Sequence, residues 1–321
     1  MRPLALAFDL GGTWARGAVL ALGPAGPVSI AEHRERWPSP NPSLAEASAL
    51  LVAMTTALEE RADACALPIG VALAGQVRPQ DGWVHVAPNL GWRSIAWGAA
   101  LRSTFPDRPL HVINDLRAAA WAEGTWGALA GASVGAIVSI GTGVGAATTI
   151  DGDPLAGARA LAGELGHLRL HGLSRRCGCG SSGCVEAYVG GRALGERVRE
   201  EAPAGATTVD EVARLAEAGD AAAAAWRADV ALRVAEAVAA LLIVVDPEVL
   251  ITTGGVLRRW RALGPIVEAE TRQRVPVPIA AGLRWVHDGL GDDAGLWGSV
   301  APWWTGRHSA ASWIDGSVDD P

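Results

Sequence analysis

The sequence contains no lysine, so all 27 of its basic side chains are arginine. A Walker P-loop needs its lysine and a Schiff-base enzyme needs a lysine amine, so both classes are excluded. The 27 basic residues face 34 acidic ones, which gives a formal net charge of −7, and no run of like charges is long enough to follow a phosphate backbone. Nucleic-acid binding is therefore disfavoured.

Long apolar runs are also lacking. The most apolar stretch, at 237–245, is too short to span a bilayer and follows several charged residues. We interpret it as a buried helix that runs into a strand. The opening residues lack the small-residue cleavage site of a signal peptide and are typical of a strand. We therefore expect a cytoplasmic protein with no membrane partner.

The chain length predicts two domains. At 321 residues the chain is too long for one ordinary core, and half of its residues are apolar, so each domain can bury a core without disulfides. Apolar strands at 4–8 and 17–22 enclose a turn of glycine and threonine, and strands at 134–140 and 146–150 enclose another. This repetition predicts a duplicated fold around a central cleft.

The two glycine turns are candidate phosphate loops. Backbone amides approach phosphate oxygens closely only where side chains are missing, and threonine hydroxyls add further donors. A glycine turn in a hairpin is often only a turn, but two of them in a duplicated arrangement favour an anion cradle. The candidates are Gly11, Gly12, Thr13, Gly141, Thr142, Gly143 and Gly145.

Two aspartates stand at predicted strand ends. Asp9 precedes the first glycine turn, where its carboxylate can face a magnesium ion through water or can bond its own loop amides. Asp115 follows the strand at 109–115 with Asn114 beside it. A carboxylate near a sugar hydroxyl can take the proton during phosphoryl transfer. The alternative is that Asn114 and Asp115 only cap the following helix.

Three of the four cysteines lie within "CGCGSSGC" at 177–184. Thiolates and imidazole are the preferred zinc ligands, and a closed structural site needs four of them. A redox pair is the competing interpretation, but disulfides do not persist in a reducing compartment. We interpret Cys65 as a buried apolar residue in a helix over 43–65. The predicted zinc ligands are Cys177, Cys179, Cys184 and His167, with His171 as an alternative to His167.

Acidic residues flank this cluster. Glu164, His167 and Glu186 are predicted to line a pocket that the zinc site holds in place. Carboxylates and an imidazole suit a ligand covered in hydroxyl groups, because each acceptor can pair with a donor. Taken singly, Glu164 and Glu186 are equally compatible with a solvated surface.

Together these motifs resemble the ROK family of sugar kinases and repressors. They occur in the family's order over about residues 4–300, and the cysteine block with "AGELGH" before it is the most specific part. The motifs are "FDLGGT" at 8–13, "IND" at 113–115, "GTGVG" at 141–145, "AGELGH" at 162–167, "CGCGSSGCVEAY" at 177–188 and "PEVLITTGG" at 247–255.

The resemblance implies an α/β, actin-like (ribonuclease-H-like) fold of two domains with sugar and ATP meeting in the cleft. We expect an N-terminal domain over 1–115 to which residues of about 290–305 return, a C-terminal domain with the zinc knuckle over 116–289, and a tail over 306–321. A homodimer is also expected from the resemblance. In the tail region, Trp303, Trp304 and Trp313 are predicted to form an aromatic cluster, and the last seven residues to be disordered.

The resemblance also implies residue roles. Asp115 would be the catalytic base on the sugar 6-hydroxyl, and magnesium would lie near Asp9. The other hydroxyls would be bound by Asn114, Glu164, His167 and Glu186, with Gly75 near the 2-position. The ATP phosphates would be held by Gly11, Gly12, Thr13, Gly141, Thr142 and Gly143, with the adenosine near Gly254 and Gly255.

We therefore expect an ATP-dependent glucokinase that uses Mg²⁺ and structural Zn²⁺ in carbohydrate metabolism, with N-acetylmannosamine kinase as the alternative. ATP is preferred over polyphosphate because polyphosphate-dependent relatives generally lack the zinc cysteines. A non-catalytic sugar sensor is less favoured, and a repressor is disfavoured because the first loop begins at residue 9. One departure from the family pattern is Trp14, which stands where a lysine or another polar residue is frequent.

Overall fold

The computed structural model describes residues 2–201 and 203–306. The sequence predictions for Trp313 and for the last seven residues lie outside these ranges. None of the helices in the described ranges is long and apolar enough to cross a membrane.

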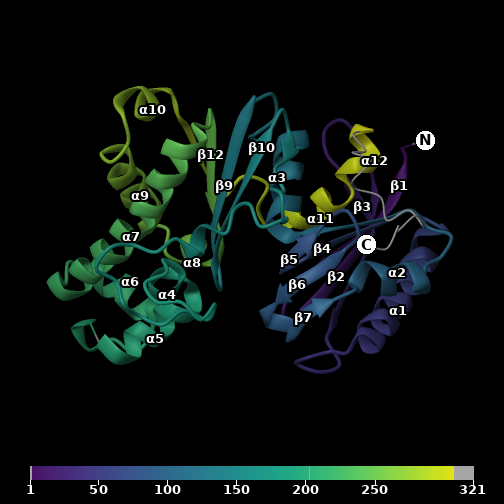
Figure 1. The fold of residues 1–321 in the computed structure, drawn as a ribbon, viewed down its shortest axis with the longest axis horizontal. Helices are drawn as coiled ribbons and strands as arrows, with labels where there is room; N and C mark the ends of the chain where they lie inside the picture. The colour runs from purple at the N-terminus through teal and green to yellow at the C-terminus, as the bar shows by residue number, and fades with distance from the viewer. Residues whose placement is uncertain (1, 202, 307–321) are drawn as a thin grey trace. The chain divides into compact units, whose positions relative to one another are not determined.

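The chain divides into two compact units (Figure 1). Among the described residues, unit 1 comprises 2–130, 153–162 and 292–306. Unit 2 comprises 131–152 and 163–291, apart from residue 202. Each unit is therefore assembled from segments that are distant in the sequence.

A five-stranded sheet of order β3-β2-β1-β4-β8 forms the centre of unit 1. The hairpin β1–β2 and the pair β2–β3 are antiparallel, whereas β4 is parallel to both β1 and β8. The strands are β1 (Leu4–Leu10), β2 (Trp14–Ala21), β3 (Val28–Arg36), β4 (Ile69–Leu73) and β8 (Leu110–Asn114).

Strand alternation gives this sheet two buried faces. Leu6, Phe8 and Leu10 point to the face packed by helix α1 (Leu44–Ala62). Ala5 and Ala7 point to the other face, where α11 (Ala294–Ser299) packs. Asp9 continues the second set, so its carboxylate projects on the α11 side.

Helix α1 begins as the sequence predicts, with Ser43 and Glu46 forming a capping box. It ends three residues earlier than expected, because Asp63 adopts a left-handed conformation with φ of 48°. Cys65 therefore lies beyond the helix and is exposed, so our interpretation of it as a buried helical residue was wrong.

Unit 1 also contains a small sheet, three short helices and a two-residue strand that the sequence patterns did not reveal. These elements are β5 (Gln76–Arg78), β6 (Trp83–Ala87), η1 (Pro88–Leu90), β7 (Trp92–Ile95), α2 (Trp97–Thr104), β11 (Asp153–Pro154) and α12 (Ala301–Thr305).

The sheet of unit 2 repeats the plan of unit 1. The hairpin β9–β10 is antiparallel, β12 lies parallel to β9, and β13 lies parallel to β12. The repeated pattern of strand, glycine turn and strand is therefore confirmed in both units. The strands are β9 (Val134–Ile140), β10 (Val144–Ile150), β12 (Val249–Thr253) and β13 (Arg284–His287).

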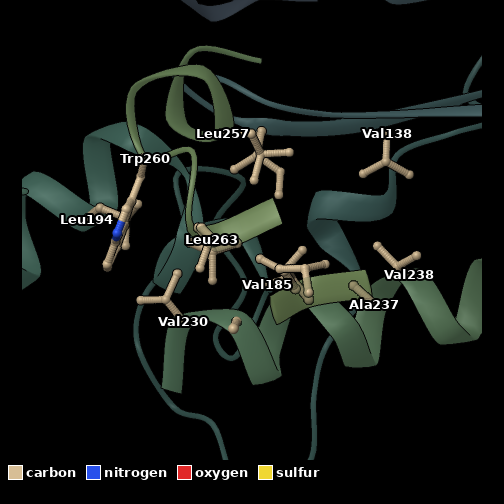
Figure 2. Close-up of a cluster of buried hydrophobic side chains, with 14 of the residues drawn as sticks. Val138, Val185, Leu194, Val230, Ala237, Val238, Leu257, Trp260 and Leu263 are labelled. Atoms are coloured by element: carbon tan, nitrogen blue, oxygen red, sulfur yellow. The ribbon is translucent and has the colours of Figure 1, made fainter. Parts of the chain in front are cut away.

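Helices pack on this sheet around a core of aliphatic side chains and two stacked tryptophans. Figure 2 shows Val138 of β9 with Val230, Ala237 and Val238 of the longest helix, α7 (Ala221–Val245). The rings of Trp226 and Trp260 lie 6.1 Å apart at 18°. The other helices are η2 (Leu165–His167), α4 (Glu186–Val189), α5 (Gly191–Glu201), η3 (Pro203–Gly205), α6 (Val209–Glu217), α8 (Gly255–Arg259), α9 (Leu263–Arg272) and α10 (Val277–Gly282), with η4 (Gly291–Asp293) following β13.

The apolar run at 237–245 is helical to its end. Asp246 takes a left-handed conformation that stops α7, and β12 begins only at Val249. Val244 is 83% exposed, so the last turn of α7 is not buried as the sequence analysis expected. The run is apolar in composition, but its last turn extends past the residues that pack on the sheet.

Helices α11 and α3 (Asp115–Trp126) cross at very short range. A Cβ atom added to Gly298 would lie 1.7 Å from the backbone oxygen of Ala118. On β4, a Cβ atom added to Gly70 would lie 2.2 Å from the backbone oxygen of Ser299, the last residue of α11. Glycine at both positions is therefore required for α11 to reach the sheet.

We predict that Gly298→Ala lowers the free energy of unfolding by about 3 kcal/mol, because the added methyl group forces the two helices apart. Denaturant unfolding checks this value. The matched control is Gly195→Ala inside α5, where the nearest atom to an added Cβ is the end of the Arg199 side chain at 3.7 Å. That change should stabilise by up to about 1 kcal/mol through helix propensity. Equal effects of the two substitutions would contradict the packing argument.

Candidate functional site

Two carboxyl groups in unit 1 lie at the ends of parallel strands. Asp9 belongs to β1, and Asp115 is the first residue of α3 directly after β8. The first turn of α11 lies against both, since a Cβ atom on Gly295 would lie 3.7 Å from the Asp9 carboxylate and 3.7 Å from the backbone oxygen of Asp115. A residue without a side chain is thus placed where the two acids meet.

Both carboxyl groups have a raised proton affinity, and burial is the largest cause for each. Burial, helped by the negative charge of Asp9, raises the pKa of Asp115 to about 7. Burial also raises the pKa of Asp9 to about 6, against the lowering effect of Arg16. A carboxyl group that titrates near neutral pH can accept a proton from a hydroxyl group at that pH.

Asn114 holds the Asp115 carboxylate in place. Its side-chain oxygen caps α3 by accepting from the backbone of Arg117 at 3.0 Å. Its amide nitrogen donates to Asp115 Oδ1 at 2.8 Å and to the backbone oxygen of Gly75 at 3.0 Å. Asn114 therefore does cap the helix, as the alternative interpretation held, while Asp115 Oδ2 makes no hydrogen bond to any residue in the described ranges.

Hydrogen bonds to its carbonyl oxygens hold the first glycine turn, Gly11–Thr13, in place. The Trp37 indole donates to the oxygen of Gly11 at 2.8 Å, and the Trp37 backbone donates to Thr13 at 3.3 Å. On another side, a Cβ atom on Gly12 would lie 2.4 Å from the Cβ of Asn89 in η1. Within the described chain, the backbone N–H groups of Gly12 and Thr13 donate to no protein acceptor, so they are available to an anion.

The second glycine turn, in unit 2, is held in the same manner. The N-terminus of α5 donates to it, from Gly191 to Gly141 at 2.8 Å and from Arg192 to Thr142 at 3.3 Å. The N–H groups of Thr142 and Gly143 are again without a protein acceptor among the residues that the structure describes. The two turns therefore present the same unused donors.

Gly145 is not part of this turn. It lies inside β10, where it pairs with Ser139, so its expected place in the anion cradle was wrong. The turn ends at Gly143, two residues earlier than expected, because the ladder resumes with Val144 opposite Ile140.

Glu186 lies against the second turn. Its Oε2 accepts from the backbone of Val144 at 2.9 Å, and a Cβ atom on Gly143 would lie 2.4 Å from the same oxygen. One of its two carboxylate oxygens is thus used by the loop. Glu186 connects the turn to α4, which follows the cysteine cluster.

Gly254 and Gly255 lie next to this turn at the same edge of the sheet. Gly254 has φ of 108°, and an added Cβ atom would lie 2.5 Å from the backbone oxygen of Ile140, the residue before Gly141. A side chain is therefore excluded at Gly254. Gly255 begins α8, and apart from its chain neighbours and its own helix backbone no atom of the described residues lies within 4 Å of the place where its Cβ would be.

The predicted metal ligands come together in unit 2. The ligand atoms of His167, Cys177, Cys179 and Cys184 all lie within 4.8 Å of one another. His167 Nδ1 is 3.8 Å from Cys177 Sγ, and the sulfurs of Cys179 and Cys184 are 3.7 Å apart. Tetrahedral zinc with bonds of about 2.3 Å to sulfur places its ligands about 3.8 Å apart, so the spacing fits. His171 is not in this group.

The backbone around the cluster explains how so short a segment surrounds an ion. Gly180 and Gly183 adopt φ of 94° and 81°, which only glycine takes without strain. The Tyr188 hydroxyl accepts from the backbone of Ser174 at 2.9 Å and of Arg175 at 2.8 Å, which anchors the segment to α4. His167 Nε2 points the other way, to Glu164 Oε2 at 3.7 Å.

Several neighbours of these groups were missed from sequence. Arg16 is opposite Asp9 in the β1–β2 ladder and pairs with Asp293 at 2.7 Å. Arg117 is buried and donates to Val77 at 2.9 Å and to Ala160 at 3.0 Å. Period-two alternation from Trp14 places Arg16 on the face of Asp9 and was the available signal. No local pattern signals Arg117, because its acceptors are backbone oxygens far along the chain.

Known proteins match the chain over most of its length. A glucokinase of Aeropyrum pernix is 29% identical over 316 residues, covering 92% of this chain and 95% of that protein. An N-acetyl-D-glucosamine kinase of Salmonella newport is 29% identical over 314 residues, covering 91% and 97%. The solved structure of a ROK family glucokinase from Streptomyces griseus, in complex with glucose and AMPPNP, aligns with a TM-score of 0.73 and 25% identity, covering 92% and 97%.

The resemblance and the actin-like α/β fold expected from the sequence are thereby confirmed. The profile that describes the ROK family matches residues 5–305. The chain therefore belongs to the ROK family.

Proposed function

We propose that the protein is an ATP-dependent hexose kinase that phosphorylates the 6-hydroxyl of glucose. The observation that carries the proposal is the Asp115 carboxyl group, which has one oxygen without a protein partner and a pKa raised to about 7. This group lies beside Asp9 and near a glycine turn with unused amides, and the chain resembles glucokinases over nine tenths of its length. A base beside a phosphate site is what sugar phosphorylation requires.

In this mechanism Asp115 accepts the proton of the sugar hydroxyl as that oxygen attacks the γ-phosphorus of ATP. The bond from the γ-phosphorus to the β,γ-bridging oxygen breaks, and ADP leaves with that oxygen. The hydrogen bonds from Asn114 and from the Leu116 backbone, both 2.8 Å to Oδ1, leave Oδ2 to face the hydroxyl. The unused amides of the two glycine turns donate to the phosphates. Catalysis is then largely positioning and charge neutralisation.

Asp9 is the proposed ligand of Mg²⁺, directly or through water. The fit is electrostatic, because burial leaves the Asp9 and Asp115 charges poorly compensated and raises both pKa values. Carboxylate oxygens are the ligands that Mg²⁺ prefers. When bound, the cation supplies charge neutralisation at the phosphates.

Glu164, His167 and Glu186 are the proposed sugar ligands in unit 2. His167 can serve both partners, since Nδ1 faces Cys177 at 3.8 Å while Nε2 faces Glu164 at 3.7 Å. We propose a structural zinc ion at the Cys3His cluster, where four protein ligands leave no open position. Its proposed role is to hold His167 and the segment before Glu186.

The remaining parts of the proposal rest on the resemblance. They are a homodimer and ATP as donor in place of polyphosphate. A cytoplasmic location, where thiolates stay reduced, is proposed from the opening residues of the sequence and not from the resemblance. The second candidate substrate is an N-acetylhexosamine, because a kinase for such a sugar matches the chain at the same 29% identity as the glucokinase. N-acetylmannosamine remains the first alternative and N-acetylglucosamine is the next.

A coupled assay of ADP release with Mg-ATP tests the proposal against glucose, mannose, fructose, N-acetylglucosamine and N-acetylmannosamine. We expect kcat/KM for glucose to exceed that for every other sugar by at least about tenfold. A preference for an acetylated sugar would move the assignment to the second candidate. No turnover on any of the five, with the protein folded, would remove the glucokinase assignment.

We predict that Asp115→Asn lowers kcat by about 10²- to 10⁴-fold, because the amide cannot accept the proton. Glucose affinity, measured by calorimetry, should change less than about threefold.

In the unchanged protein, kcat/KM should fall as the pH drops below about 7, since the protonated Asp115 carboxyl group cannot act as a base.

The matched control for Asp115→Asn is Asp107→Asn, an exposed aspartate shortly before β8. It should retain full activity. An active Asp115→Asn enzyme would rule out the base assignment.

We also predict one zinc ion per chain by elemental analysis. Cys184→Ser should lose the ion and lower the free energy of unfolding by several kcal/mol, about the scale of a structural zinc site. Cys65→Ser is the control, because Cys65 is exposed and outside the cluster. Metal-free protein with unchanged thermal stability would contradict a structural zinc site.

A further inference from the structure

A second cationic group lies beside the first glycine turn. Trp14, the residue directly after the turn, is 40% exposed. The Arg34 guanidinium lies over its ring at 4.4 Å from the centroid, and that of Arg36 at 5.9 Å. An exposed indole that contacts two guanidinium groups is thus placed at the edge of a candidate phosphate site. We name Trp14, Arg34 and Arg36 the arginine platform.

The register of the sheet directs the platform toward the acids. Asp9 pairs with Arg16 and Arg16 pairs with Arg34, so these three lie in one row across β1, β2 and β3. Trp14 pairs with Arg36 in the next row of the same face, nearer to the glycine turn. Neighbouring strands are about 4.8 Å apart, so Arg34 lies about 10 Å from Asp9 between their backbones. An extended arginine side chain covers much of that distance.

The end of β3 is fixed to the turn itself. Trp37, the residue after Arg36, donates from its indole to Gly11 and from its backbone to Thr13. Arg36 therefore keeps its place relative to the unused amides of Gly12 and Thr13. The hydrogen bonds of Trp37 thus hold the backbone of Arg36 in place, whatever contacts the Arg36 side chain makes.

The charges of the platform have no ion-pair partner among the described residues. Arg16, in the same sheet face, pairs with Asp293 at 2.7 Å and with Glu32 at 3.7 Å. Arg34 and Arg36 make no ion pair with any carboxylate in the part of the chain that the structure describes. Two free guanidinium groups on a flat aromatic support suit an oxyanion such as phosphate, which arginine binds through paired donors.

The turn beside the platform must hold the phosphate that is transferred. That phosphate has to lie next to the acceptor hydroxyl, and hence next to the base Asp115. Asp9 and Asp115 both lie against Gly295, the negative charge of Asp9 acts on Asp115, and β1 leads from Asp9 through Leu10 into Gly11–Thr13. We propose that Arg34 and Arg36, supported by Trp14, bind the terminal phosphate of the phosphoryl donor. This inference rests on the proposed function. It assigns Arg34 and Arg36 as the cationic side chains at this turn, in a chain that has no lysine.

The test is calorimetric binding of Mg-ATP, Mg-ADP and inorganic tripolyphosphate to the full chain without sugar. The double variant Arg34→Gln/Arg36→Gln should bind Mg-ATP and tripolyphosphate at least about tenfold more weakly, with a smaller dependence on salt. Its affinity for Mg-ADP, which lacks the terminal phosphate, should change less than about twofold. Unchanged ATP binding would overturn the proposal, and so would equal weakening of ATP and ADP.

The matched control is Arg199→Gln/Arg214→Gln, which removes the same charge from exposed positions on α5 and α6. It should bind all three probes like the unchanged protein. Trp14→Leu should weaken ATP binding by about 2- to 5-fold through loss of the cation–π contacts, and Trp14→Phe should restore most of it. Wild-type binding by Trp14→Leu would overturn the role of the indole.

The kinase assay separates this inference from the proposed function. The double variant should show a KM for Mg-ATP raised about tenfold, with the KM for glucose unchanged. Wild-type protein that binds ATP but phosphorylates no sugar would remove the proposed function, and the binding comparison would still decide the platform.

Discussion

The burial of two carboxyl groups beside one another is the constraint on which unit 1 depends. Asp9 and Asp115 have pKa values of about 6 and 7, both raised above the value of 3.8 for an isolated aspartate. A raised folded-state pKa stabilises the fold below pH 3.8, and this contribution is lost as the pH rises through 6 and 7. At neutral pH the pair therefore costs stability, at roughly 1.4 kcal/mol for each pKa unit before solvent screening is discounted. Ionisable groups with such strongly shifted pKa values are found mainly at functional sites, where their charge takes part in binding or catalysis.

The surrounding structure keeps this pair together. β4 lies between β1 and β8 and carries only the small Ala72 opposite Asp9, and Gly295 leaves room where α11 meets both acids. Gly298 and Gly70 then let the same helix pack tightly on α3 and on the sheet. The close packing of α11 thus limits the water around the two carboxyl groups, and this desolvation is the largest cause of their raised pKa values.

The two glycine turns have the same pattern of hydrogen bonds. In each, neighbouring groups engage the carbonyl oxygens, while amides of the turn keep no acceptor among the described residues. The clamps themselves differ: an indole from β3 holds the turn of unit 1, whereas the backbone of α5 and the Glu186 carboxylate hold that of unit 2. The two turns thus share a pattern of engaged carbonyl oxygens and unused amides but differ in the groups that hold them.

Sequence alone determined the elements whose signals are local: the two hairpins with glycine turns, the start of α1 near Ser43 and the Cys3His spacing, because these depend on residues close together in the chain. It did not determine where α1 and α7 end, the exposure of Cys65, or the partners of Trp14, Trp37 and Arg117. The two helices end at left-handed Asp63 and Asp246, which no sequence pattern marked, and the exposure of Cys65 follows from the first of these ends. The partners of Trp14, Trp37 and Arg117 are distant in the sequence and meet them only when β3 pairs with β2 and when 153–162 joins unit 1. The raised pKa of Asp115 belongs to the same class. Sequence placed the acid at a strand end, but only tertiary packing removed water from it and put a second charge beside it.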